Sequence, residues 1–442
     1  MQTIGQWILI LTVGAVATGC SGGAGSGNPA DREKRALALV DHAASGRFAE
    51  ARADFNMVMA IGLSKTKFET VWKGLEDQVG KFRKRTWVKQ GEDRGYNIVR
   101  VGLEFEKATM AARVVFDSGD DVTGLFFKPW APDWKAPDYP KQTGFTEAEI
   151  EFGHPDWRLS GTLTVPEGIP NPPVVILVHG SGPQDRDQTI GGNRPFKDIA
   201  WGLGWQGVAV LRYEKRTKSH PGKLAQQKHF TMRQETVEDA VFAYEFLRQR
   251  QDVDPKSIYL LGHSQGGYCA PRIARQTEGL AGFISLAGNS RPLEELILEQ
   301  TEYLANINPK QAPDLKGMRL AAEQVKRLTP ADARKRGVLL GAPMSYWFDL
   351  QNYDPIETAK EFNGRILILH GGRDYQVSEK DFSRWTNGLA KQPDLESKTF
   401  PSLNHLMMSG TGKSTPAEYQ QVGHVQSVVV AEIARWVKDG NN

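Results

Sequence analysis

Two hydrophobic periods follow one another in the first third of the chain. Over residues 33–79, apolar side chains recur at spacings of three and four, which is the repeat of an amphipathic helix and predicts two or three short helices. Over 99–105 the period changes to two, and the runs 110–116 and 122–127 alternate in the same way. Residues 33–128 are therefore predicted to form a small α+β domain, with helices packed on an antiparallel meander of three strands.

Beyond residue 145 the pattern changes to short runs that are apolar throughout, separated by longer stretches. Strands buried on both faces have this composition, because helices cover each face of a parallel sheet. After a short strand ending at Pro166, the apolar runs are 174–178, 208–211, 258–261, 283–286 and 366–369. The stretches long enough for crossover helices are 195–206, 231–251, 265–277, 378–391 and 423–438. We predict an α/β domain at residues 145–440, built on a doubly wound, mostly parallel sheet.

Two segments interrupt these patterns. Residues 129–144 are rich in Pro and Trp and can donate few backbone hydrogen bonds, so we interpret them as a stiff linker between the two domains. Residues 288–362 have helical periodicity and no clear strand, which predicts a helical cap inserted in the larger domain.

The chain opens with an apolar run ahead of small residues and a cysteine. This is the layout of a secretory signal, and the run is too short to span a bilayer. Its ending, Ala-Thr-Gly-Cys20, resembles the bacterial lipoprotein signal, which implies cleavage before Cys20 and lipid attachment to that residue. We expect a signal peptide at 1–19, a flexible Gly/Ser-rich tether at 20–32, and an exported lipoprotein anchored at the periplasmic face or cell surface. An ordinary signal peptide cut near Ala17 is the alternative.

Composition removes several classes of function. The chain has 442 residues, 40% hydrophobic and 24% charged, which is the usage of a soluble globular protein. The formal net charge is +3 with no dominant basic block, so we expect no nucleic-acid partner. The basic run 81–89 is interpreted as a solvated face, with a weak contact to anionic surfaces as the alternative. Two cysteines, Cys20 and Cys269, exclude a disulfide framework and a cysteine-based metal site. The oligomeric state stays open.

A serine lies on a Gly-rich turn between a predicted strand and a predicted helix. The pentapeptide GHSQG, centred on Ser264, follows the run 258–261 and precedes the helix 265–277. Such a turn raises the serine clear of the sheet with its hydroxyl exposed. Ser264 is therefore the candidate nucleophile, and a βα turn without chemistry is the alternative.

A serine nucleophile needs a base, and the base needs an acid that orients it. Asp374 lies in HGGRD just past the strand 366–369, and His405 lies in a loop after the next predicted strand. The order Ser264, Asp374, His405 is the one this architecture requires. His424 is the rival base. Two further residues are given structural interpretations, His370 as a support and Asp381 as a carboxylate on a helix surface.

The Gly-rich end of the strand 174–178 can provide an oxyanion hole. In the sequence HGSGP that follows, a backbone N–H can point at the negative oxygen of a tetrahedral intermediate. We assign this donor to Ser181, with Gly182 as the alternative, and the second donor to the N–H of Gln265. His179 is interpreted as a hydrogen-bonding support of the loop.

These motifs together carry a family resemblance. The segment from HGSGPQDRD to YEKR, followed in order by GHSQGG, HGGRD and LNH, resembles the α/β-hydrolase superfamily and its bacterial carboxylesterases. The resemblance covers about residues 145–440 and implies ester hydrolysis through an acyl-enzyme, with no cofactor or metal. Ser264 would be the nucleophile, His405 the general base and then acid, and Asp374 the residue that fixes the tautomer of His405.

Other residues receive roles from the same comparison. Asp185, Arg186 and Asp187 match the family loop and are interpreted as an ion-paired clamp, while Cys269 is interpreted as a small buried helix residue. Residues 33–128 resemble the DUF3887 family, with a likeness to NTF2-like or cystatin-like domains.

The predicted function is hydrolysis of small-molecule carboxylic esters, with the cap forming the acyl or alcohol pocket. One alternative is a serine aminopeptidase or another amide or thioester hydrolase, in which a cap carboxylate binds a substrate ammonium. The candidates for this are Glu294, Glu295 and Glu299, which otherwise read as the solvated face of a helix. A second alternative is a non-catalytic surface binding protein.

Overall fold

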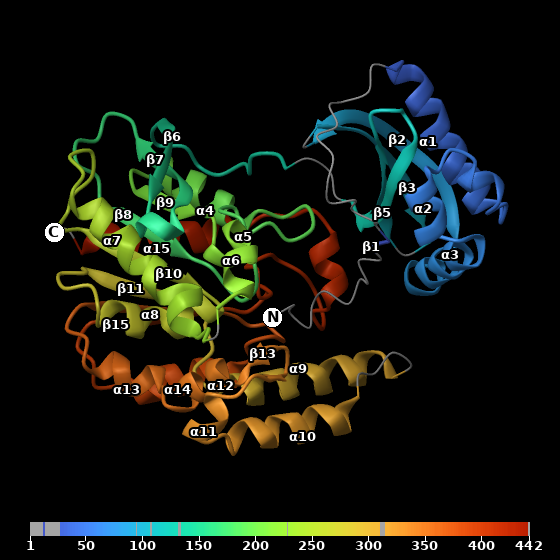
Figure 1. Cartoon of the computed structure of the whole chain (residues 1–442). Coiled ribbons are helices and arrows are strands. Elements are labelled where there is room, and N and C mark those ends of the chain that lie inside the picture. The colour runs from blue at the N-terminus through green and yellow to red at the C-terminus, as the bar shows by residue number, and fades with distance from the viewer. Residues whose placement is uncertain are drawn as a thin grey trace. The chain divides into compact units, whose positions relative to one another are not determined.

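The computed structural model describes residues 12–13, 27–93, 95–106, 108–130, 134–227, 229–309 and 314–440. They form two compact units (Figure 1). The smaller unit lies before Trp134, and the larger unit spans Trp134–Tyr419 and continues from Gly423. Among these described residues, no helix is both long and apolar enough to cross a bilayer.

The smaller unit is an antiparallel sheet with helices on one face (Figure 1). Its helices are α1 (Pro29–Ala44), α2 (Met57–Gly62) and α3 (Lys65–Val79), with a 3-10 turn at Glu50–Arg52. Its strands are β2 (Phe82–Asp93), β3 (Tyr96–Phe105), β4 (Thr109–Phe116) and β5 (Val122–Pro129), and the short β1 (Thr12–Val13) pairs with β5. Their order is β1-β5-β4-β3-β2. The alternating side chains Val99, Val101 and Leu103 face the helices and are buried against the same core as Trp72.

Strand β2 corrects the predicted meander of three strands. It covers the basic run 81–89, pairs with β3 and forms an edge of the sheet. Most of its residues are exposed, in agreement with the solvated face expected for the run. A polar edge strand lacks the buried apolar face on which recognition by periodicity depends.

The larger unit contains a sheet of eight strands in the order β15-β14-β11-β10-β8-β9-β7-β6. Six of them are mutually parallel: β8 (Val174–Val178), β9 (Ala209–Tyr213), β10 (Ile258–His263), β11 (Gly282–Leu286), β14 (Arg365–Gly371) and β15 (Leu395–Phe400). The antiparallel hairpin β6 (Phe145–Phe152) and β7 (Leu159–Pro166) completes one edge. The predicted doubly wound, mostly parallel sheet is confirmed.

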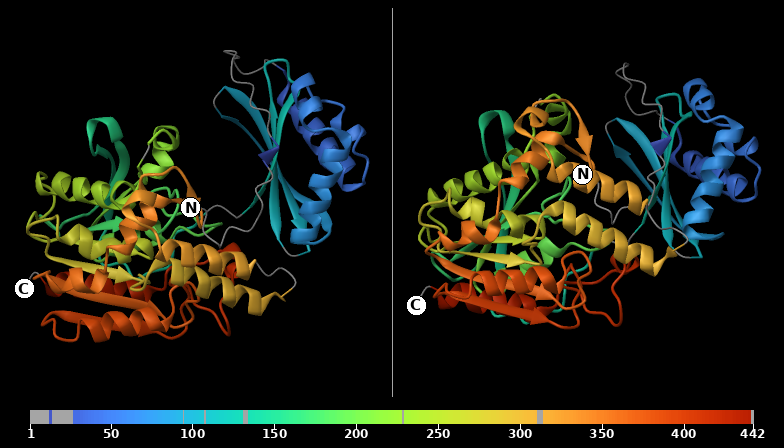
Figure 2. Two further views of the ribbon diagram at one scale, coloured as in Figure 1. Left: turned by 60° about the horizontal axis from the view of Figure 1, so that its bottom comes forward. Right: turned by 90° about the horizontal axis from the view of Figure 1, so that it is seen from below.

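Helices cover both faces of this sheet (Figures 1 and 2). One face packs on α4 (Pro195–Gly204) and α15 (Ser427–Asp439), and the other on α7 (Glu238–Arg248), α8 (Gln265–Ala274) and α14 (Glu379–Gly388). Strand β8 shows why both faces need a cover: its neighbouring residues Ile176 and Leu177 point to opposite faces, belong to different cores and are both fully buried. Shorter elements connect these parts: α5 (Arg216–Ser219), α6 (Pro221–Ala225), a π turn at Arg233–Val237, and 3-10 turns at Pro155–Trp157 and Pro416–Gln420.

The segment predicted as a helical cap is largely helical. Its helices are α9 (Leu293–Ile307), α10 (Leu315–Lys326), α11 (Pro330–Ala333), α12 (Met344–Gln351) and α13 (Pro355–Lys360). A small hairpin, β12 (Val338–Leu339) with β13 (Ala342–Pro343), departs from the prediction of a cap without strands. Helix α13 packs on α8, the helix that follows Ser264, and Arg272 of α8 pairs with Asp349 of α12 at 2.8 Å.

The segment predicted as a stiff linker is partly packed on the larger unit. The Trp134 indole N–H donates to Asp198 at 2.8 Å, and the Tyr139 hydroxyl donates to the Val425 carbonyl. Tyr139 is buried in the core beneath α4 and α15. Aromatic side chains in a Pro-rich segment can therefore act as anchors as well as spacers.

Candidate active site

Ser264 occupies a sharp turn between β10 and α8. Its backbone has φ 54° and ψ −119°, a conformation that costs a non-glycine residue energy and is common at functional turns. The glycines of GHSQG are required here by space: a Cβ on Gly262 would lie 2.2 Å from Gly266, and one on Gly266 would lie 2.2 Å from the Val178 carbonyl oxygen. The turn therefore places Ser264 at the carboxyl end of β10, where parallel-sheet enzymes form their sites.

Asp374 and His405 form a buried pair at the same edge of the sheet. The His405 Nδ1–H donates to Asp374 Oδ2 at 2.7 Å, since a carboxylate only accepts. The other oxygen of Asp374 accepts from the backbone N–H groups of Gln376 and Val377, at 2.8 and 3.0 Å. These two backbone hydrogen bonds fix the carboxylate of Asp374. Because the carboxylate holds the imidazole proton on Nδ1, Nε2 of His405 carries no proton and is able to act as a base.

His263 holds the His405 loop against the serine turn. The two imidazole rings lie 4.7 Å apart between centroids, and His263 Nε2 lies 2.9 Å from the backbone carbonyl of His405. The Gln188 amide nitrogen, which only donates, lies 2.7 Å from His263 Nδ1, so the ring proton is on Nε2. Burial lowers the pKa of His263 to about 3, which keeps it neutral. The residue before Ser264 thus positions His405, although no hydrogen bond joins the Ser264 hydroxyl to His405 among the described residues.

The Gly-rich loop after β8 lies directly beside Ser264. A Cβ on Gly180 would lie 3.3 Å from the Cβ of Ser264, so the backbone of this loop approaches the nucleophile closely. The Gly180 N–H donates to the Gln188 amide oxygen at 3.1 Å. His179 supports the loop as expected, with Nε2 3.0 Å from the Asp185 carbonyl, and burial lowers its pKa to about 3.

Gln188 and Asn404 are positioning residues that the sequence analysis did not identify. Gln188 joins the Gly-rich loop to His263, and it directly follows the HGSGPQDRD motif. Asn404 precedes His405 and accepts hydrogen bonds from the N–H groups of Leu406 and Met408, at 3.0 and 3.1 Å. The one sequence feature that points to these two residues is their position beside or within the HGSGPQDRD and LNH motifs.

The rival base, His424, belongs to a different pair. Its Nδ1 lies 3.0 Å from Asp198 on α4, and this hydrogen bond raises the pKa of His424 above its usual value. Asp198 also accepts from Trp134 and from the backbone of Val425, so the pair ties the ends of the larger unit together. His370 is buried with its ring stacked on Phe382, consistent with the structural interpretation.

Two of the three residues expected to form an ion-paired clamp, Arg186 and Asp187, do so. Arg186 contacts Glu149 of β6 at 2.6 Å and Glu214 at 3.0 Å, while Asp187 pairs with the buried Arg212. Asp185 makes no ion pair with the part of the chain that the structure describes; its carboxylate accepts from the Thr189 N–H at 2.9 Å. The clamp therefore fixes the loop that carries Gly180 and Gln188.

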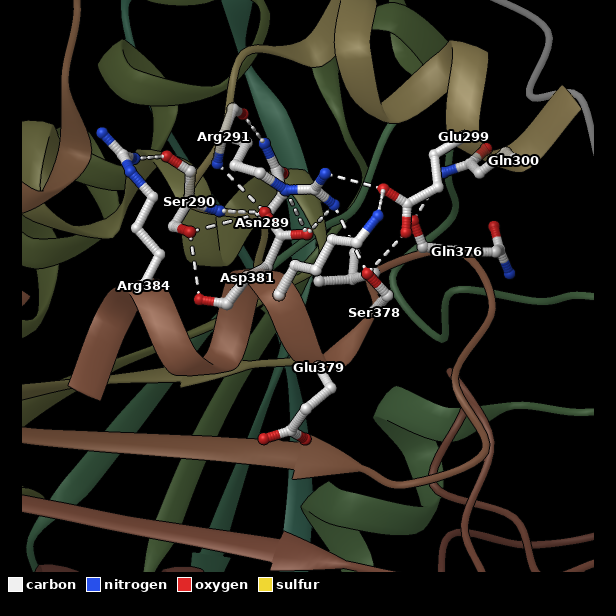
Figure 3. Close-up of polar contacts among 12 residues, drawn as sticks. Asn289, Ser290, Arg291, Glu299, Gln300, Gln376, Ser378, Glu379, Asp381 and Arg384 are labelled. Carbon is white, nitrogen blue, oxygen red and sulfur yellow. Dashed lines mark hydrogen bonds and ion pairs between the residues drawn. The ribbon is translucent and has the colours of Figure 1, made fainter. Parts of the chain in front are cut away.

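Asp381 is not on a helix surface, which corrects the prediction. It is fully buried at the start of α14 and accepts hydrogen bonds from the backbone N–H groups of Ser290 and Arg291, at 2.8 and 3.0 Å (Figure 3). The Arg291 guanidinium lies 2.6 Å from the same carboxylate and 2.6 Å from Glu299 (Figure 3). The cluster joins α14 to α9 of the cap and to the segment between β11 and α9.

The cap carboxylates also differ from a uniformly solvated face. Glu299 is ion-paired with Arg291 and accepts from Ser378 at 2.7 Å, and Glu295 lies 3.1 Å from Lys326. Glu294 is buried, which raises the pKa of its carboxyl. Helical periodicity in the sequence does not distinguish a polar side chain that faces solvent from one that pairs with a buried partner.

Of the two cysteines, Cys269 lies in the described part of the chain and Cys20 does not. Cys269 is buried in α8 as predicted, and burial raises the pKa of its thiol to about 12. The expectation for Cys20, like that for most of the predicted signal peptide and tether, lies outside the described residues.

Comparison with known families divides the chain in the same way as the fold. Residues 36–125 match a family described as a protein of unknown function, DUF3887, and residues 205–424 match the prolyl oligopeptidase family. The chain is 37% identical over 410 residues to the esterase EstD of Thermotoga maritima, a match that covers 92% of this chain and 95% of that protein. The predicted resemblances for both domains are thereby confirmed.

Similar solved structures include two esterases at low sequence identity. Est1E from Butyrivibrio proteoclasticus is 16% identical, with a TM-score of 0.43, covering 66% of this chain and 98% of that one. The Pyrococcus furiosus esterase Pf2001 is 12% identical, with a TM-score of 0.44, covering 69% of this chain and 98% of that one.

Proposed function

This chain belongs to the same α/β-hydrolase family as the esterase EstD and is a carboxylesterase-like hydrolase, and from this premise we propose that it cleaves small carboxylic esters through an acyl-enzyme on Ser264. The observation that carries the proposal is the buried Asp374–His405 pair, held by His263 against the turn that carries Ser264. A non-catalytic binding protein has no need of this arrangement.

Each residue has one task in the proposed reaction. His405 Nε2 removes the proton from the Ser264 hydroxyl as its oxygen attacks the ester carbonyl, and then gives that proton to the departing alcohol. Asp374 keeps the proton of the neutral imidazole on Nδ1 and stabilises the imidazolium that forms. Water then attacks the acyl-enzyme by the same route, with His405 again as base. No metal or cofactor takes part in these steps.

The negative oxygen of each tetrahedral intermediate needs two donors. We assign them to the backbone N–H groups of Ser181 and Gln265. The close approach of Gly180 to Ser264 supports the first assignment, and the position of Gln265 at the start of α8 supports the second, because a helix N-terminus favours negative charge.

Ester hydrolysis is favoured over aminopeptidase activity by the state of the cap carboxylates. An aminopeptidase binds the substrate ammonium with an available anion, but Glu299 and Glu295 are engaged with Arg291 and Lys326. Glu294 is buried, so little of its carboxyl is open to a substrate ammonium. The match to the prolyl oligopeptidase family is the reason to test amide substrates directly.

The test is a comparison of kcat/KM for short-chain p-nitrophenyl esters and aminoacyl p-nitroanilides. We expect the esters to be turned over far faster, with rates declining as the acyl chain outgrows the pocket formed with the cap. Ser264→Ala, prepared in parallel, controls for contaminating esterases and is expected to be inactive. A higher kcat/KM for the amides would replace the ester assignment by the peptidase one.

We further propose that the enzyme acts at a membrane surface, to which a lipid on Cys20 tethers it. The lipoprotein-like sequence ending at Cys20 and the Gly/Ser-rich segment after it support this proposal.

A further inference from the structure

A buried lysine lies behind the loop that carries the proposed oxyanion donor. Lys215 follows β9 and is 2% exposed, and its ammonium donates to the Gly180 carbonyl oxygen at 2.8 Å. The same ammonium donates to Glu235 Oε1 at 2.7 Å. A buried ammonium needs such partners, and one of the two found among the described residues is a backbone carbonyl next to the nucleophile.

The contact with Gly180 fixes the direction of the next N–H group. The peptide bond between Gly180 and Ser181 is trans, so its C=O and N–H lie in one plane and point in opposite directions. With the carbonyl held by Lys215, the Ser181 N–H points away from Lys215. A rotation of this peptide would exchange the two groups and present a carbonyl oxygen in place of the donor.

The second carboxylate oxygen of Glu235 reaches the other proposed donor residue. Glu235 Oε2 accepts from the Gln265 amide at 3.0 Å and from the Tyr346 hydroxyl at 2.7 Å. The Gln265 amide also lies 2.9 Å from the Tyr346 hydroxyl. Lys215, Glu235, Gln265 and Tyr346 are all buried, so they form one network. Tyr346 belongs to α12 of the cap, and Gln265 follows the nucleophile.

We propose that Lys215 and Glu235 are positioning residues that hold both backbone donors of the oxyanion hole, and that Tyr346 makes this arrangement depend on the cap. The proposal rests on the acyl-enzyme mechanism given above, in which Ser181 and Gln265 supply those donors. None of the three side chains contacts the reacting atoms in this account; they act through the backbone of the Gly-rich loop and through the side chain of Gln265.

The network has the charge balance that such a role requires. Burial by itself raises the pKa of the Glu235 carboxyl, but Lys215 and the hydrogen bonds from Tyr346 and Gln265 outweigh it and hold the pKa below its usual value. Glu235 is therefore ionised, and the pair with Lys215 stays charged. A fixed ammonium and carboxylate orient the dipoles around them before the substrate arrives.

A neighbouring buried pair provides a matched control. Arg216, next in sequence, contacts Asp239 at 2.5 Å, and both are 1% exposed. This pair joins α5 to α7 and has no hydrogen bond to Gly180 or Gln265 among the described residues. Neutralising it removes a buried ion pair of the same kind without touching the proposed oxyanion hole.

The experiment compares the neutral double variants Lys215→Met/Glu235→Gln and Arg216→Met/Asp239→Asn. For each, kcat and KM for p-nitrophenyl butyrate are measured together with the Ki of an aryl trifluoromethyl ketone, which forms a tetrahedral adduct with serine. We expect the first variant to lose about 10- to 100-fold in kcat, with a matching rise in Ki and a KM within about threefold of wild type. The control variant is expected to lose stability, with kcat and Ki within about threefold.

Equal kcat and Ki in the two folded double variants would overturn the positioning role. If Lys215→Met/Glu235→Gln does not fold, Tyr346→Phe decides: removing only the hydroxyl is expected to lower kcat and raise Ki about three- to tenfold, and no change would overturn the proposal. Activity that persists in Ser264→Ala would instead contradict the proposed function itself, so the two failures are distinguishable.

Discussion

Two Asp–His pairs in the larger unit look alike by distance but differ in what surrounds them. His405 pairs with Asp374 beside the serine turn, whereas His424 pairs with Asp198, which also holds Trp134 and the backbone of Val425. Asp374 keeps one carboxylate oxygen for the imidazole of His405. Asp198, on α4, accepts from Trp134 and Val425 as well as from His424. At the residue scale, this difference in surroundings is why we propose the catalytic role for His405 and a structural one for His424.

Asp374→Asn is expected to lower kcat by about 10³- to 10⁴-fold, because an amide in place of the carboxylate favours the wrong tautomer of His405. Asp198→Asn is the matched control: it is expected to lower the free energy of unfolding while kcat stays within a few fold. Steady-state kinetics and urea unfolding of both variants check this. Near-normal turnover in Asp374→Asn would remove that residue from the triad.

His179 and His263 are both buried and neutral, so they make stability depend on pH. Burial lowers the pKa of each to about 3, below the usual value of 6.5, so the unfolded chain binds more protons below pH 6.5. Their contribution is complete above pH 6.5 and is lost as the pH falls toward 3, at about 1.4 kcal/mol per pH unit for each residue. Urea unfolding of the wild type and of His179→Gln between pH 6.5 and 4 tests this. The variant is expected to show the shallower dependence, and identical slopes would contradict the assignment.

At the scale of helices and strands, buried apolar runs were the reliable signal. The central strands can be predicted because each contains a run of apolar side chains, which in β8 covers the whole strand, and burial of both sheet faces by helices follows from that. Strand β2 was missed because its exposed, basic residues look like a solvated loop. Asp381 was misplaced because its partners, Ser290 and Arg291, lie some 90 residues away in sequence. Contacts of that kind are set by the tertiary fold and leave no local periodicity.

The Asp381 cluster is expected to stabilise the junction between the cap and α14. Asp381→Ala removes the acceptor of the Ser290 and Arg291 N–H groups and one of the two carboxylates that pair with the Arg291 guanidinium, which predicts a loss of about 3–5 kcal/mol in the free energy of unfolding. Glu295→Ala removes a half-exposed ion pair with Lys326 and is expected to cost less than about 1 kcal/mol. Chemical denaturation of both variants decides, and equal losses would show that burial does not set the strength of this cluster.

At the scale of the whole molecule, the motifs and their order gave the fold family and the triad candidates from sequence. The positioning residues were not found this way, because Lys215 and Glu235 are charged residues whose burial comes from packing between β9, α8 and the cap. The division into two units could be placed near the Pro-rich segment, yet the packing of Trp134 and Tyr139 on the larger unit depends on acceptors far along the chain.

Membrane attachment is a prediction about the whole protein. Cys20→Ser is expected to move the enzyme from the membrane fraction to the soluble fraction, because the proposed anchor is the lipid on that thiol alone. Cys269→Ala, at the other cysteine, is expected to leave attachment unchanged. Fractionation with immunodetection measures both. A mature N-terminus found by mass spectrometry with a free, unmodified Cys20 would refute lipidation.

The central claim is that Ser264 is an activated nucleophile. The most direct measurement is labelling of the folded protein with a fluorophosphonate probe, followed by mass spectrometry of the modified peptide, with Ser264→Ala in parallel. We predict one covalent adduct on Ser264 in the wild type and none in the variant. No labelling of the folded wild type, or labelling that persists in Ser264→Ala, would contradict the account.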